Sequence, residues 1–495
     1  MGNDAPRQAD ARLRRRTIAT YAAGSIGTGG FATLPGLVLT YYLTDSLGVA
    51  ALLAGVIVTA AKVWDVVIDP VVGALTDDDL RRHGSRRRLM VIGGVSLPVL
   101  FALTFAVPPG LAPAIGAVWV LVAFLLTATA FSLFQVPYIA LPAELTDRYD
   151  ERTRLLTWRV VVLTFAILLF GAGGPLLRKA TGDPTTGYLL MGVVAGVTIG
   201  VGMLVSASVA RHGLRTRSAM AAVGTSTAEE AELVADATGA APAHRVGADA
   251  STPGGGIRDN FRAAFDTLRR SQPFRALLLT FVLQALATGL MLAGAQYLAT
   301  WVLRSEDAVT LLFVALIAPA LVAAPAWGAL ARRAGKERSF ALAGILFAVA
   351  ALSTVAALWA PGGWIYASVA VAGIAYAGMQ SLPMAMLPDV ISHDARQYGA
   401  GRAGAFGGIW TAGETTGFAL GATALAIVLA ATGYVERVAG VSVTQPDAAI
   451  AGIVLSFSVL PAALVVASLV PLARYRLRRD DIEEQTHWDR VPLQP

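Results

Sequence analysis

Two carboxylates, Asp65 and Asp69, stand one helical turn apart in the apolar stretch KVWDVVIDPVVGALTDD at residues 62–78. Side chains four positions apart share one face of a helix, so both acids project to the same side. In a membrane helix, a buried carboxylate costs about 2.5–3.5 kcal/mol even on insertion scales. Because two such groups repel each other, they favour a bound cation or a shared proton. The alternative is a structural ion pair with an arginine of a neighbouring helix.

A third acid, Glu414, lies in GGIWTAGETTGFALG at residues 407–421. It is 12 residues past Arg402, or about 18 Å of helix, a depth similar to that of Asp65. We expect Glu414 to contact a substrate or to carry a second proton. Pairing with Arg159 is the structural alternative.

Three more side chains are weaker candidates for substrate contacts. Gln135 and Gln380 could face a cavity, but each could equally bond across helices. Trp410 could stack on a substrate ring, although interfacial anchoring is the more frequent role of tryptophan in membranes.

The composition predicts that membrane helices position these residues. Of 495 residues, 55% are hydrophobic and only 15% are charged, and the mean hydropathy is +0.61. Soluble chains carry about 25% charged residues. The chain has no cysteine, which excludes disulfides and thiol nucleophiles. With no nucleotide loop or metal-ligand motif either, we expect neither an enzyme nor a cofactor, only a coupling cation.

Twelve apolar stretches are long enough to cross about 30 Å of hydrocarbon. Clusters of arginine fall on alternate loops, so the positive-inside rule puts both termini in the cytoplasm. The net charge of +6 therefore reflects topology, and we expect no nucleic-acid partner. The predicted units are a tail at 1–16, six helices within 17–210, a linker with an amphipathic helix at 211–272, six helices within 273–473, and a tail at 474–495.

The two halves repeat one another. VGALTDDDLRRHGSRRRL at 72–89 matches WGALARRAGKERSFAL at 327–342, and QVPYIALPAELTD at 135–147 matches QSLPMAMLPDVISHD at 380–394. Duplicated six-helix units are typical of rocking transporters with a site between the halves. Ala320 and Ala324 occupy the positions of the two acids in the second copy, so packing alone does not demand the acids.

The motif W-D-x-x-x-D-P, followed by a loop that ends in GSRRR, resembles the glycoside–pentoside–hexuronide:cation symporters of the major facilitator superfamily. This resemblance implies an all-α fold with twelve transmembrane helices in two pseudo-symmetric six-helix bundles. It implies a cation site at Asp65, Asp69 and Ser132, and a substrate arginine at Arg159. We also expect alternating access. Asp77, Arg86 and Arg87 fit an inner gate loop, where ion pairs between the halves would hold one conformation, but as a charge run they could equally serve only to set topology.

Departures from the family leave the ion and the cargo open. Ile68 stands where relatives have an amide, and because Na⁺ wants several oxygen ligands, we expect H⁺ rather than Na⁺. Gly29 and Gln135 replace sugar-binding acids, and Glu414 replaces a lysine. We therefore expect either a glycoside-like solute or, alternatively, a lysolipid or other amphiphile as the cargo. We also expect the transporter to be a monomer in a bacterial cytoplasmic membrane.

Overall fold

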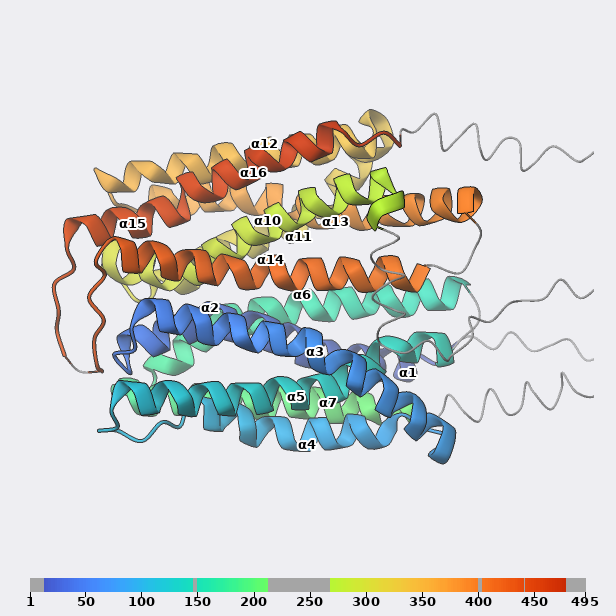
Figure 1. Ribbon diagram of the computed structural model, residues 1–495, viewed down its shortest axis with the longest axis horizontal. Helices are drawn as coiled ribbons and strands as arrows, with labels where there is room; N and C mark the ends of the chain where they lie inside the picture. The colour runs from blue at the N-terminus through green and yellow to red at the C-terminus, as the bar shows by residue number, and fades with distance from the viewer. Residues whose placement is uncertain (1–12, 146–148, 212–267, 399–402, 440, 478–495) are drawn as a thin grey trace, which may run out of the picture.

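The computed structural model describes residues 13–145, 149–211, 268–398, 403–439 and 441–477, and these residues are almost entirely helical (Figure 1). Within these ranges, extended pairing is limited to one isolated bridge between Leu47 and Val438. The helices are α1 Arg15–Ala22, α2 Gly24–Asp45, α3 Ala51–His83, α4 Arg87–Thr104, α5 Pro113–Leu145, α6 Tyr149–Lys179, α7 Pro184–Ala207, η1 Val209–Arg211, α10 Gln272–Tyr297, η2 Leu298–Val302, α11 Ala308–Ala334, α12 Lys336–Ser353, η3 Thr354–Leu358, α13 Trp364–Tyr398, α14 Ala403–Ala431, α15 Asp447–Phe457 and α16 Val459–Ala473.

In the described part of the chain, these helices form 12 segments long and apolar enough to cross a membrane, as the sequence predicts. Helices α3 and α13 extend beyond their apolar stretches and continue through polar residues to His83 and Tyr398. Helix α3 ends where Gly84 adopts φ +67°, a left-handed conformation that glycine adopts without steric cost. Most of the predicted linker at 211–272 lies outside the described residues.

The helices pack as two bundles, α1–α7 and α10–α16, which lie one above the other in Figure 1. They meet where α2 packs on α10, α3 on α14, and α6 on α11. We call the end that holds Arg15 and Ala473 the terminal end, and the opposite end, with Asp45 and Lys179, the distal end. A Cβ at Gly55 of α3 would overlap Ala426 of α14, so this glycine allows the bundles to touch near the distal end.

Large apolar side chains cover the outward faces of the spans. Val322 is 80% exposed, and Val99, Phe165 and Val349 are also exposed. In water such a surface would be unfavourable, whereas lipid tails cover it at no cost. The outward faces are therefore consistent with helices embedded in a bilayer.

Candidate functional site

The acid pair of α3 lies near the middle of its helix. Asp65 and Asp69 are 14 and 18 residues past Ala51, or about 21 and 27 Å from the distal end of α3. Ser132 of α5 is buried, and its side chain interacts with the carboxylate of Asp69. The structure thus brings together the three residues that the resemblance implied for the cation site.

A lysine that our sequence reasoning missed completes this cluster. Lys62 Nζ lies 3.2 Å from Asp65 Oδ2 and 5.7 Å from the centroid of the Phe31 ring. The other oxygen, Asp65 Oδ1, is buried and has no hydrogen-bond partner among the described residues. The i, i+3 spacing of Lys62 and Asp65 was visible in KVWD and could have predicted the pair. We name Lys62, Asp65, Asp69 and Ser132 the α3 cluster.

The rotation of α3 about its axis is fixed by a bond on its other side. Trp64 Nε1 donates to Thr129 Oγ1 of α5 at 2.9 Å, and Trp64 is 37% exposed. With Trp64 turned toward lipid, Asp65 lies on a less exposed face. On the pseudo-equivalent helix α11, Ala324 stands at the position of Asp69 and lines a cavity of about 630 Å³.

That cavity is separate from the predicted site. It opens between the terminal halves of α11 and α13, the start of α12, and residues 475–477. Its charged lining includes Lys336 and Asp389, whose Nζ and Oδ2 atoms lie 2.5 Å apart. None of the residues that we predicted to bind the cation or the substrate is among those lining this cavity.

Two predicted substrate residues are engaged within the first bundle. Gln135 Oε1 accepts a hydrogen bond of 2.8 Å from Thr28 Oγ1 of α2. The Arg159 guanidinium carbon lies 5.3 Å from the centroid of the buried Tyr138 ring, a cation–π contact. The Tyr138 hydroxyl in turn lies 3.0 Å from Ser25 Oγ. Arg159 is therefore oriented by an aromatic ring, and among the described side chains no carboxylate pairs with it.

On the second bundle, Gln380 and Glu414 both interact with one tyrosine, Tyr376. Gln380 Nε2 donates to the Tyr376 hydroxyl at 2.8 Å, and the carboxylate of Glu414 interacts electrostatically with that phenol. The proposed ion pair between Glu414 and Arg159 is absent from the described side chains, so the structural alternative for Glu414 is not realised in this conformation. Tyr376 was missed because a lone tyrosine in an apolar helix carries no distinguishing sequence signal.

Trp410 does not lie where we predicted a substrate-stacking ring. It is 2% exposed and stacks on Phe281 of α10, with 4.3 Å between ring centroids. The prediction overlooked that residues 407–421 repeat glycine on one face, which lets α14 approach α10 closely; a Cβ at Gly417, for example, would press on the backbone of Val282. The Trp410 ring therefore packs within the second bundle in this conformation.

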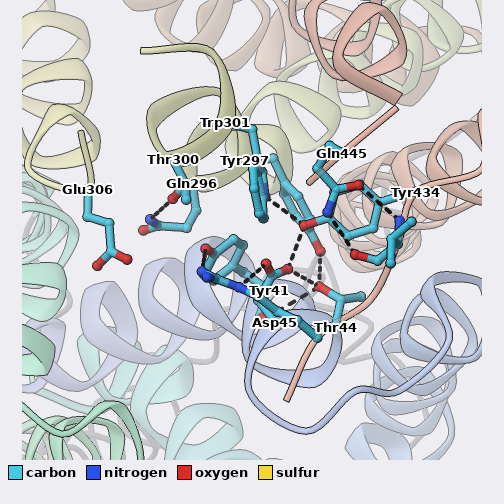
Figure 2. A network of polar contacts seen from close by, with 12 residues as sticks. Tyr41, Thr44, Asp45, Gln296, Tyr297, Thr300, Trp301, Glu306, Tyr434 and Gln445 are labelled. Atoms are coloured by element: carbon cyan, nitrogen blue, oxygen red, sulfur yellow. Dashed lines mark hydrogen bonds and ion pairs between the residues drawn. The ribbon is translucent and has the colours of Figure 1, made fainter. Parts of the chain in front are cut away.

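The distal end holds a polar network that joins the two bundles (Figure 2). Asp45, buried at the end of α2, accepts hydrogen bonds from Arg437 Nε at 3.1 Å, Tyr434 Oη at 2.8 Å and Thr44 Oγ1 at 2.7 Å. Thr44 Oγ1 also lies 2.7 Å from Tyr297 Oη of α10. Burial and the nearby Asp45 carboxylate raise the pKa of Tyr434 well above its usual range, so this phenol keeps the proton that it donates.

Backbone contacts hold the loop that carries Arg437 in place. The backbone N–H groups of Arg437 and Ala439 donate to the carbonyl oxygens of Thr44 and Ser46, both at 3.0 Å. Within the loop, the Gln445 side-chain amide bonds to the N–H and C=O of Val435 at 2.9 and 2.7 Å. The loop between α14 and α15 is thus tied to the end of α2.

Two further ion pairs connect α6 with the loop before α11. Arg178 Nη2 lies 2.9 Å from Glu306 Oε2, while Arg178 Nη1 donates to the Tyr188 hydroxyl at 3.0 Å. Lys179 Nζ lies 2.7 Å from Asp307 Oδ1. We name the distal-end bonds of Asp45, Arg178 and Lys179 the distal network. Our sequence reasoning missed this network. Isolated charged residues on loops that are otherwise poor in charge could have indicated it.

The predicted inner gate residues lie at the terminal end. Arg86 caps α4, and the backbone N–H of Arg87 donates to Ser85 Oγ at 3.2 Å. Asp77 belongs to α3, but its side chain lies outside the described part of the chain. A gating role for these residues stays a prediction. The polar network that joins the two bundles, which includes the Asp45–Arg437 and Arg178–Glu306 ion pairs, lies at the opposite end.

The sequence and the fold of the chain are similar to those of known transporters. The family described as MFS/sugar transport protein matches residues 20–479. The chain is 26% identical over 188 residues to the glucuronide carrier protein homolog of Escherichia coli (strain K12), covering 38% of this chain and 41% of that protein. It is 26% identical over 162 residues to the sodium-dependent lysophosphatidylcholine symporter 1-A of Danio rerio, covering 32% and 30%. The chain thus spans less than half the length of these curated relatives.

Solved structures agree on the fold. A proton-dependent oligopeptide transporter matches with a TM-score of 0.61 and 16% identity, covering 93% of this chain and 98% of the other. At that identity the likeness establishes the architecture alone.

Proposed function

Because the chain belongs to the MFS/sugar transport family, we propose that it is a secondary active symporter, which moves a small organic solute across the cytoplasmic membrane together with a cation. The α3 cluster carries this proposal. Asp65 and Asp69 lie at mid-helix in only one of two repeated halves, where a carboxylate is costly unless it binds something. Relatives named as symporters support the same activity.

The coupling ion in this proposal is H⁺. A hard cation such as Na⁺ wants several oxygen ligands, and Ile68 supplies none between the two acids. Lys62 also places a positive charge 3.2 Å from Asp65, which disfavours a second cation there. A proton needs only a carboxylate oxygen, so it suits this cluster better.

The transport cycle follows from the closed distal end. If the terminal end faces the cytoplasm, as the arginine clusters predict, the distal network closes the outer side and the structure faces inward. Alternating access would then break the distal network and close the terminal end, where Asp77, Arg86 and Arg87 lie. Since both bundles belong to one chain, a monomer is sufficient for transport.

The proposed cargo is a glycoside-like solute. The substrate site would lie between Arg159 and Gln135 of the first bundle and Glu414 and Gln380 of the second. A relative named as a glucuronide carrier homolog supports a sugar. A lysolipid is the second candidate, supported by a relative named for lysophosphatidylcholine and by Gly29, which packs on Ala166 and offers no polar group.

The test is concentrative uptake in vesicles with an imposed pH gradient, screened with radiolabelled glycosides and lysolipids. We expect accumulation that collapses with a protonophore, and we expect Asp65→Asn and Asp69→Asn to abolish it while the protein still folds in the membrane. Stimulation by Na⁺ at constant pH would refute the proton assignment. Tags at either terminus that react from outside would refute the orientation.

A further inference from the structure

Five charged side chains lie ten or more residues from both ends of their helices in the described part of the chain: Lys62, Asp65, Asp69, Arg159 and Glu414. In their ordinary ionised forms they sum to one net negative charge. Because an uncompensated charge at membrane depth is costly, the loaded site must gain one positive charge. In the proposed function the coupling cation supplies that charge. The cargo itself should therefore be neutral overall.

Local contacts divide these five residues into two groups. Lys62 and Asp65 form an ion pair within α3, and the Asp69 carboxylate interacts electrostatically with the same Lys62 and also with Ser132. Arg159 and Glu414 differ, because among the described side chains neither has a partner of opposite charge. Arg159 lies over the ring of Tyr138, and Glu414 interacts electrostatically with the phenol of Tyr376.

The two charges without opposite partners lie on opposite bundles and at similar depth. Arg159 is 20 residues from the distal end of α6 at Lys179, and Glu414 is 17 residues from the distal end of α14 at Ala431. At 1.5 Å per residue these separations are about 30 and 26 Å. A molecule held between the bundles at this level would have a guanidinium on one side and a carboxylate on the other.

We propose that the cargo is a zwitterion without net charge, whose anionic group binds Arg159 and whose ammonium group binds Glu414. This proposal rests on the proposed transport function and names its substrate class. A guanidinium fork matches the geometry of a carboxylate or phosphate. A neutral sugar would leave both charges without partners, and a purely anionic cargo would leave the loaded site with net negative charge.

Two sources could provide such a cargo, an amino sugar that carries an acid or the head group of a zwitterionic lipid. Isothermal titration on the full-length protein in nanodiscs distinguishes them with two ligand series. The sugar series is muramic acid, its N-acetyl derivative and glucosamine. The lipid series is glycerophosphocholine and glycerol 3-phosphate. We expect the zwitterion of one series to bind at least about tenfold more tightly than the analogues that lack its cationic or its anionic group.

Variants then assign each charge to its residue. Glu414→Gln should remove the preference for muramic acid over N-acetylmuramic acid, or for glycerophosphocholine over glycerol 3-phosphate, while the anionic analogue binds as before. Arg159→Met should weaken both the zwitterion and the anion. Asp447→Asn, which alters an exposed carboxylate at the start of α15, is the matched control and should change neither. Should a variant fail to fold, the wild-type ligand series decides alone.

The outcomes separate this proposal from the proposed function. Equal binding of the zwitterions and of the analogues that lack one of the two opposite charges, or no binding of either zwitterion, overturns the zwitterion proposal. Proton-coupled uptake of a neutral methyl glycoside would also overturn it, while leaving the transport proposal intact. A zwitterion that binds with the expected preference but is not carried with protons would instead refute the proposed symport.

Discussion

Charged side chains at the distal end and at mid-membrane differ in whether they form ion pairs between the two bundles. At the distal end, acids and bases of opposite bundles bond directly, as Asp45 does with Arg437 and Arg178 with Glu306. At mid-membrane, the ion pair of Lys62 forms within its own helix, and no pair joins the bundles among the described residues. Pairs between bundles stabilise one conformation, whereas unpaired charges between bundles can bind a ligand.

The distal network also illustrates why such pairs can act as a switch. Taking Asp45 and Arg437 out of water costs about as much as their attraction returns, unless further hydrogen bonds satisfy them. Tyr434 and Thr44 provide those bonds to Asp45. When the bundles separate, water can replace every one of these partners. In the proposed cycle, the closed state would therefore be specific in geometry and still able to open.

The largest expected effect comes from removing one partner of the Asp45–Arg437 ion pair at the distal end. Arg437→Met leaves the Asp45 carboxylate, 1% exposed, without its counter-ion while the distal end is closed. Breaking a fully buried pair costs about 3–5 kcal/mol, and we expect about 2–3 kcal/mol because Arg437 is partly exposed. The conformational equilibrium of this variant should therefore shift from the state with a closed distal end toward a state in which the distal end is open.

Spin labels can measure this shift because the chain has no native cysteine. Ala50→Cys and Val441→Cys place labels on exposed positions of opposite bundles. Their separation should lengthen in Arg437→Met and return toward that of the wild type when Asp45→Asn is added, since the double change leaves no buried unpaired charge. An unchanged distance in Arg437→Met would contradict a closing role for the pair.

Adjacent basic residues of α6 offer a matched test of burial. Arg178 is 5% exposed and bonds both Glu306 and Tyr188, so Arg178→Met should destabilise the protein by about 1–3 kcal/mol. Lys179 pairs with Asp307, which is 67% exposed, and such pairs contribute about 0.2–1 kcal/mol. In thermal unfolding in detergent, the melting temperature of Arg178→Met should be well below that of Lys179→Met. Equal melting temperatures would show that burial does not set the strength of these pairs.

Much of the fold could be predicted from sequence because the membrane constrains it strongly. Backbone groups in lipid must be satisfied within a helix, so apolar length alone predicted the twelve spans. The ends were less certain, as at His83, because polar residues continue a helix into water until a residue such as Gly84 stops it. The pairing of Asp69 with Ser132 followed from a motif and a resemblance.

The parts that could not be predicted depend on contacts between distant segments. Asp45 and Arg437 are 392 residues apart, and nothing in either segment indicates the other. Trp410 was misplaced because its sequence neighbourhood does not reveal that α14 turns this ring toward Phe281. Local spacing predicts which residues share a helix face, but the neighbour of that face is decided by packing.

The smallest expected effect comes from a distal carboxylate that bonds only within its own bundle. Asp183 caps α7, and hydrogen bonds from the Thr186 hydroxyl at 2.6 Å and backbone N–H at 2.8 Å hold the pKa of this exposed carboxylate below its usual range. A depressed folded pKa contributes stability above the unfolded value of about 3.9, and this contribution is lost as pH falls through the folded pKa. Asp183→Ala should therefore lower the melting temperature slightly at pH 7, and the difference should disappear toward low pH. The label distance between positions 50 and 441 should stay that of the wild type at pH 7, because Asp183 does not bridge the bundles. A longer distance in this variant would mean that a distal charge affects closure without bonding to the opposite bundle. That result would contradict the distinction between charges that bond across the bundles and charges that bond only within one.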